Sequence, residues 1–147
     1  MKILIIILTL FLNNGTHYND SHIILTKITE IYEMKDITIN LYYIPSRFTQ
    51  IQDYHIHGFT LFNDIPDRTY IIYLNPNLTN EQLIKVLIHE MVHVNQMYNG
   101  DLYYINNRFI VYKNDTIDLV NIPYFMRSFE TDAFLEERYI HNKYFKK

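Results

Sequence analysis

The sequence has no cysteine and no tryptophan, and only three glycines and four prolines among its 147 residues. Without cysteine, neither a disulfide nor a thiolate zinc site can form, so any bound metal must be held by histidine and carboxylate side chains. Because glycine and proline are scarce, no flexible linker divides the chain, and its length fits a single domain. Apolar residues make up 48% of the chain, which is typical of a folded domain and excludes a disordered tail.

Positive charge is also scarce. The formal net charge is −3, and no run of basic residues occurs anywhere in the chain. Proteins that bind nucleic acids usually carry a cluster of lysine and arginine side chains. The composition therefore argues against a nucleic-acid partner.

The chain has only one extended apolar run, and it is short. Residues 3–12 are apolar apart from Thr9, which is too short a run for a helix that crosses a bilayer, so no stable membrane span is expected. We interpret residues 1–16 as an export signal, with 17–147 as a single domain. The alternative is a buried first strand, because the run is rich in β-branched isoleucine. The location of the protein, exported or cytoplasmic, depends on this choice.

Periodicity and turn residues predict the secondary structure of the rest of the chain. Thr79 or Asn80 is expected to cap the second helix, and Ser128 the third. The mixed order of helices and strands, with short connections, indicates an α+β fold with a small, mostly antiparallel sheet. The expected elements are helices at 21–34, 79–98 and 128–145, strands at 37–44, 54–62 and 68–74, and a hairpin around Asn106 and Asn107.

The stretch 87–96, LIHEMVHVNQ, carries the strongest chemical signal. His89 and His93 are one helical turn apart, so their rings can converge on one metal ion. Glu90 lies about 100° around the helix from His89, which places it beside the pair as a general base. The alternative is an ordinary amphipathic helix with two histidines on its polar side, which we expect to lie near solvent.

A catalytic zinc ion takes three protein ligands and keeps a fourth position for water, whose pKa it lowers towards neutrality. Two histidines are therefore not enough, and the third ligand must come from another element. The final helix is the simplest source. The downstream candidates are Asp101, Asp115, Asp118, Glu130, Asp132, Glu136, Glu137 and His141.

The segments 86–102 (VLIHEMVHVNQMYNGDL) and 124–137 (YFMRSFETDAFLEE) together resemble the small gluzincin-type, thermolysin-like zinc peptidases of bacteria and phages. The shared pattern is H-E-x-x-H with a nearby glutamine, a Gly-Asp-Leu-like turn, and then an aromatic-rich stretch that runs into Glu-x-x-Ala on a second helix. The resemblance implies a compact zincin-like domain, which we expect to be monomeric. It also implies hydrolysis of a peptide or protein substrate.

The same resemblance assigns residues. It implies one zinc ion held by His89, His93 and Glu130, with Glu90 as the base. It also implies that the strand at 68–74 is a sheet edge that pairs with an extended peptide.

The sequence departs from the family pattern on the final helix. Phe134 stands where thermolysin-like members have an aspartate that supports a ligand histidine. Asp132 or Glu137 is expected to supply that support, and helical spacing places Glu137, but not Asp132, on the stripe of Glu130. Ala133 is expected to let the two helices approach closely.

Other polar residues complete the hypothesis. Tyr124, with Arg127, is expected to stabilise the oxyanion of a tetrahedral intermediate. His55 and His57 share one face of a strand and are expected to be half-exposed sheet surface rather than a second metal pair. The predicted function is a zinc metallopeptidase. The alternative is a non-catalytic metal-binding or structural domain, for example phage-associated, that keeps a zincin-like fold.

Overall fold

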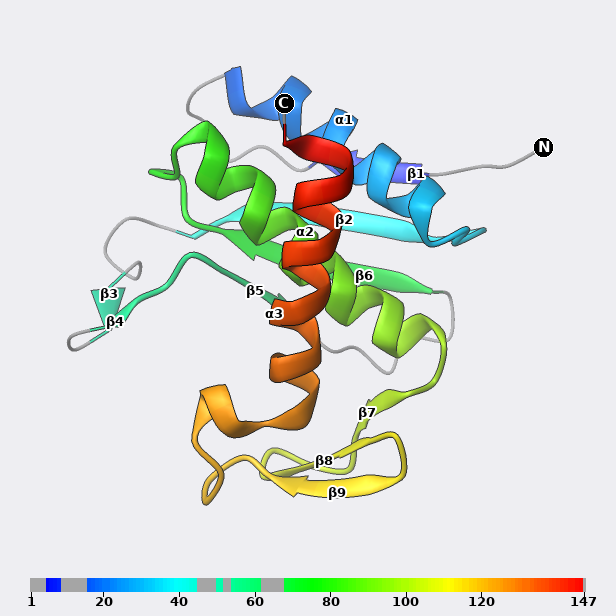
Figure 1. Ribbon diagram of the computed structural model, residues 1–147, viewed down its shortest axis with the longest axis vertical. Coiled ribbons are helices and arrows are strands. Elements are labelled where there is room, and N and C mark those ends of the chain that lie inside the picture. Colours follow the sequence, from blue (N-terminus) through cyan, green and yellow to red (C-terminus); the bar gives the residue numbers. More distant parts are fainter. Residues whose placement is uncertain (1–4, 9–15, 45–49, 52–53, 62–67, 147) are drawn as a thin grey trace.

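The computed structural model describes residues 5–8, 16–44, 50–51, 54–61 and 68–146. The predicted α+β class is confirmed (Figure 1). The helices are α1 (Thr16–Ile31), α2 (Asn80–Tyr98) and α3 (Ser128–Ile140), with a 3-10 turn, η2 (Tyr124–Met126), before α3 and a π-helical turn, η3 (His141–Phe145), after it. The strands are β1 (Ile5–Leu8), β2 (Thr38–Tyr43), β3 (Gln50–Ile51), β4 (Tyr54–His55), β5 (Gly58–Leu61), β6 (Thr69–Leu74), β7 (Leu102–Tyr104), β8 (Phe109–Tyr112) and β9 (Asp115–Asp118).

The largest sheet in the described residues has four strands in the order β1-β2-β6-β5. β1, β2 and β6 are parallel, and β5 joins β6 in the antiparallel sense. The smaller sheets, β3-β4 and β7-β8-β9, are antiparallel, so antiparallel pairs are in the majority, as predicted. One expectation is wrong: β6 is not a sheet edge, because it lies between β2 and β5. The edge strands of this sheet are β1 and β5, and β5 is the one that pairs with β6.

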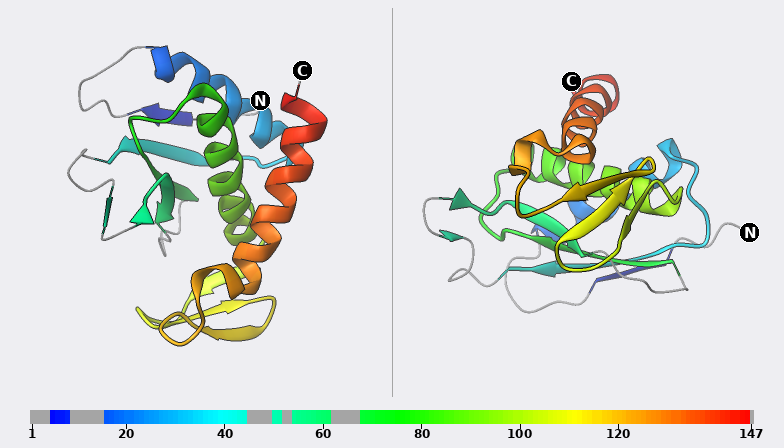
Figure 2. Two further views of the ribbon diagram at one scale, coloured as in Figure 1. Left: turned by 60° about the vertical axis from the view of Figure 1, so that its left-hand side comes forward. Right: turned by 90° about the horizontal axis from the view of Figure 1, so that it is seen from below.

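Helices α1 and α2 pack on one face of this sheet, and α3 lies along α2 on the side away from the sheet (Figure 2). The largest buried core joins both helices to β2 and β6. Its fully buried members are aliphatic or methionine side chains, as the hydrophobic effect requires. They include Leu25, Ile28, Ile39, Ile72, Leu74, Leu87, Ile88 and Met91.

Helix α2, which carries the H-E-x-x-H motif, is firmly capped at its N-terminus. The Thr79 hydroxyl accepts a hydrogen bond from the Gln82 backbone N–H, and the Gln82 side chain accepts one from the Thr79 N–H. Such a capping box satisfies two backbone donors that the helix leaves unpaired. At the other end the helix stops at Asn99, and Gly100 follows with φ of 78°, a conformation that suits glycine. Both expected ends of this helix are confirmed.

Three element predictions need correction. The first helix begins at Thr16 rather than at residue 21. Ser128 is the first residue of α3 and not its cap, since Arg127 holds the N-cap position without a side-chain hydrogen bond. The strand expected at 54–62 is divided into β4 and β5, and residue 62 lies outside the described residues.

The expected hairpin around Asn106 is present as β7 and β8, but a third strand, β9, extends it. Lys113 and Asn114 form the turn between β8 and β9, which the sequence-based prediction did not separate from the preceding strand. Both have positive φ, 49° and 72°, as a tight two-residue hairpin turn requires.

Ile5–Leu8 forms strand β1, paired in parallel with β2, which agrees with the strand interpretation of the first apolar run. Residues 1–4 and 9–15 lie outside the described residues, and the export interpretation stays a prediction. Among the described residues, no helix is both long enough and apolar enough to span a membrane.

Strand β5 lies unusually close to α2, and Gly58 allows this approach. A β-carbon added at Gly58 would stand 2.6 Å from the Val86 Cγ1 atom and 3.0 Å from the Tyr73 carbonyl oxygen. Both neighbours would have to move, and one of them is backbone. The absence of a side chain at Gly58 therefore sets the distance between the edge strand and the motif helix.

We predict that Gly58→Ala lowers the free energy of unfolding by about 1–3 kcal/mol, the usual effect of overpacking a close contact. Urea unfolding measures it. Val86→Ala relieves one of the two close contacts, so the double variant should be more stable than the sum of the single effects implies. Wild-type stability in Gly58→Ala would show that the approach is not tight.

Candidate metal centre

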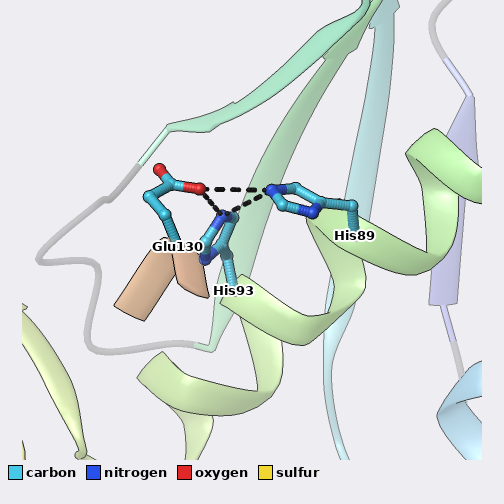
Figure 3. A group of neighbouring side chains, drawn as sticks. All are labelled: His89, His93 and Glu130. Atoms are coloured by element: carbon cyan, nitrogen blue, oxygen red, sulfur yellow. Dashed lines mark hydrogen bonds and ion pairs between the residues drawn. The ribbon is translucent and has the colours of Figure 1, made fainter. Parts of the chain in front are cut away.

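Three side chains converge at the contact between α2 and α3 (Figure 3). The Nε2 atoms of His89 and His93 lie 3.2 Å apart, and each lies 3.2 Å from the Glu130 Oε2 atom. A tetrahedral zinc ion with ligand distances of about 2.0–2.1 Å separates any two ligand atoms by about 3.3 Å. The triangle thus has the size of one face of such a tetrahedron, and the three residues form a group able to hold a metal ion.

The group is buried, with exposed fractions of 6% for His89, 4% for His93 and 5% for Glu130. The expectation that the histidine side of the helix lies near solvent is therefore wrong. The physical reason is α3, which enters after η2 and covers that side of α2 with its first turns. Ala133 is fully buried, in agreement with the predicted close approach of the helices.

The orientation of His93 is fixed by Gln96, one helical turn along α2. Gln96 Nε2 donates a hydrogen bond of 3.1 Å to the carbonyl oxygen of Phe129, which can only accept. Gln96 Oε1 therefore faces His93 Nδ1, at 2.9 Å, and must accept a proton from it. This places the hydrogen of a neutral His93 on Nδ1 and leaves the Nε2 lone pair directed at the other two ligand atoms.

Glu137 fixes the orientation of the His89 ring, as Gln96 fixes that of His93. Its Oε2 atom lies 3.2 Å from His89 Nδ1, so the carboxylate accepts the Nδ1 hydrogen. Phe134 packs against the His89 ring with a centroid distance of 4.5 Å. Asp132 points elsewhere, as predicted, and accepts hydrogen bonds from Tyr112 and Lys113. Of the two supports considered from the sequence, Glu137 is the one that contacts a ligand histidine.

Since both Nδ1 atoms donate outward, two imidazole lone pairs and one carboxylate oxygen face one another inside a buried space. Three acceptors at this distance repel unless a cation or a proton lies between them. In the metal-free protein we expect a proton on His89 to relieve this repulsion. Burial lowers the pKa of His89, but hydrogen bonds with Glu130 and Glu137 outweigh burial and raise the pKa to about 9. Burial raises the pKa of Glu130, but the two histidines outweigh it and hold this pKa at about 2.

Glu90 lies beside the triangle and is not part of it. Its Oε2 atom accepts a hydrogen bond of 2.7 Å from the Thr60 hydroxyl on β5. Burial raises the pKa of the Glu90 carboxyl, although the two histidines and the Thr60 hydrogen bond lower it. A buried carboxylate beside the three converging side chains, but outside them, has the position expected of a general base.

A cleft of about 500 Å³ opens onto this group. Tyr124 lines it from η2, and about half of its side chain is exposed. Partial burial of Tyr124 and the nearby Glu130 carboxylate raise the pKa of its hydroxyl, so it remains a hydrogen-bond donor. The three candidate metal ligands, Glu90 and the strand β5 therefore meet in one cavity. Its lining comprises His55, Ile56, His57, Gly58, Phe59, Thr60, Lys85, Val86, His89, Glu90, His93, Tyr124, Glu130, Phe134 and Glu137.

The other residues considered from the sequence are Arg127, His55 and His57. Arg127 donates to the carbonyl oxygens of Ile122 and Leu119, and it supports the segment before α3 rather than lining the cleft. His55 and His57 are exposed, as expected, but they line the mouth of the same cleft. Neither belongs to a group of three or more metal-binding side chains among the described residues.

Two functional residues were not assigned from the sequence. Gln96 stands three residues after His93, so helical spacing alone could have placed it against that ring. No spacing or motif in the sequence indicates that Thr60 contacts Glu90. Its contact with Glu90 joins residues 30 positions apart and depends on the pairing of β5 with β6.

Comparison of the chain with protein-family models, curated proteins and solved structures finds no match. The resemblance to gluzincin-type peptidases therefore depends on the motif residues and on the site that they form.

We predict that Glu130→Gln weakens zinc binding more than any other single carboxylate change on α3, because it removes a ligand. Glu137→Gln should weaken binding by about 10–100-fold, since it removes a hydrogen bond to a ligand histidine. Asp132→Asn is the matched control, and its zinc affinity should equal that of the wild type. Competition with a chelating dye measures all three. Full affinity in Glu130→Gln would refute the assignment.

We predict that a rise in pH from 6 to 9 lowers the stability of the metal-free protein and raises the affinity of the protein for zinc. The raised pKa of His89 stabilises the metal-free fold fully below its ordinary value of 6.5, and this stabilisation is lost as pH rises through about 9. The lowered pKa of Glu130 adds stability that is present above its ordinary value of 4.5 and lost as pH falls towards about 2. Zinc must displace the histidine proton, so zinc affinity should rise with pH.

Urea midpoints in chelator and zinc dissociation constants, both measured from pH 6 to 9, test this pair of trends. Zinc affinity that does not change with pH would count against a site with two histidine ligands.

Proposed function

We propose that the protein is a zinc-dependent peptidase that hydrolyses peptide bonds in extended protein segments. The observation that supports this most strongly is the triangle of three ligand atoms at 3.2 Å with a separate, buried carboxylate beside it. A structural zinc site needs four protein ligands, whereas three ligands leave a position for a reactant. Zinc suits the donor set of two imidazoles and one carboxylate.

The chain supplies each part that peptide hydrolysis requires. A zinc ion bound at the triangle would polarise the substrate carbonyl and make a water molecule more acidic. Glu90 takes the proton of the attacking water and passes it to the leaving amine. Tyr124 donates its hydroxyl hydrogen towards the oxygen of the scissile carbonyl, where negative charge develops. Glu137 and Gln96 keep the two ligand rings in the orientation and tautomer that bind metal.

The edge strand β5 suits an extended substrate. The Asn75 N–H donates to the His57 carbonyl, and the Leu74 carbonyl accepts from Ile44 on the other side of β6. Alternation along an antiparallel ladder then directs the backbone groups of Gly58 and Thr60 away from β6, towards the cleft. A peptide that added to this edge would lie across the metal-binding group, held mainly by backbone hydrogen bonds that tolerate many side chains.

We predict that Glu90→Gln keeps the fold and the zinc affinity but lowers hydrolysis of unfolded casein by at least about two orders of magnitude, the usual effect of losing a general base. Zinc content, thermal stability and casein cleavage, measured on one preparation, test this. An active variant, or one that loses zinc, would contradict the role of Glu90. A wild-type protein that binds zinc but cleaves nothing would support a non-catalytic metal-binding domain instead.

A further inference from the structure

We propose that Thr60 is a positioning residue that holds the Glu90 carboxylate in its working orientation and ties it to the strand that receives the substrate. The inference rests on the proposed function and extends it to a residue on a different element. Thr60 Oγ1 lies 2.7 Å from Glu90 Oε2, and the two residues are 6% and 5% exposed. No motif in the sequence marks Thr60.

The direction of this hydrogen bond follows from chemistry. An ionised carboxylate has no hydrogen, so the hydroxyl must donate. Thr60 Oγ1 also lies 3.3 Å from the Glu90 backbone oxygen, but one hydroxyl hydrogen favours the shorter contact to the charged group. One carboxylate oxygen is thereby held, and the other is left to accept from a water molecule in the cleft.

The fold keeps Thr60 in place through strand register. In β5 the side chain of Thr60 is buried towards α2, whereas Phe59 and Leu61 on either side are exposed. A slip by one residue would turn Thr60 away from the helix and bring an apolar side chain towards Glu90. The small residue Gly58 lets the strand approach α2 closely enough for the 2.7 Å contact.

Thr60 thus has two roles in one residue. Its backbone groups face the cleft edge, where a substrate strand would pair, and its side chain holds the base. The distance between the base and the scissile bond is then set by a single residue rather than by two elements that move independently. Such alignment matters, since a displacement of about 1 Å lowers a rate by about 100-fold.

The experiment compares Thr60→Val, which removes the hydroxyl and keeps the shape, with Thr60→Ser, which keeps the hydroxyl. The substrate is a fluorogenic peptide taken from casein around a bond that the wild type cleaves. Thr60→Val should lower kcat about 10-fold or more with KM almost unchanged, because alignment of the base is lost and binding is kept. Thr60→Ser should recover most of kcat. Zinc affinity should stay at the wild-type value in both.

Thr29→Val is the matched control, because Thr29 is also buried and donates a hydrogen bond of 2.7 Å, to the Leu25 carbonyl in α1. Its kcat should not change. The proposal is overturned if Thr60→Val keeps the wild-type kcat, loses zinc or changes only KM, or if Thr60→Ser is as impaired as Thr60→Val. If the wild type cleaves no bond, the proposed function fails and the role of Thr60 falls with it.

Discussion

The site depends on one constraint. The rings of His89 and His93 direct unprotonated Nε2 atoms at the Glu130 carboxylate inside the protein. Glu137 and Gln96 accept the Nδ1 hydrogens of the rings, and the Phe129 carbonyl prevents the Gln96 amide from turning round. The three ligand atoms then have no hydrogen to share unless the site takes up a proton. A divalent cation resolves this repulsion better than one proton, because it contacts all three atoms at once.

The elements around the site serve this arrangement. Helix α2 supplies both histidines and Glu90, the proposed base, because the spacing of its residues matches the helical period. Helix α3 buries them and contributes Glu130 and Glu137 from one stripe, and its small Ala133 allows the close packing. Strand β5 lies on the other side of α2 and lines the cleft, and among the described residues it pairs on one side only, with β6. The Glu90 carboxylate is thus held between the helix that carries the candidate metal-binding histidines and the strand β5.

Sequence reasoning found what is local and missed what depends on packing. Residue spacing and capping predicted the convergence of the two histidines and the ends of α2, and the resemblance on α3 predicted that Glu130 joins them. The edge position expected for β6 came from the resemblance, and it was wrong because strand order depends on contacts between distant segments that the sequence does not show. Every second residue of β6 is buried, because one face of this central strand packs in the core with α1 and α2. Burial of the histidines and the contact of Thr60 with Glu90 could not be predicted either, because both depend on packing between elements that are distant in the sequence.

The central claim is that His89, His93 and Glu130 bind one zinc ion and leave a fourth position open. X-ray absorption at the zinc edge, recorded on protein loaded with one equivalent of zinc, tests it most directly. The account predicts about four nitrogen and oxygen neighbours at about 2.0–2.1 Å, with the scattering pattern of two imidazole rings. A spectrum with six oxygen neighbours and no imidazole, or with only one imidazole ring, would contradict it.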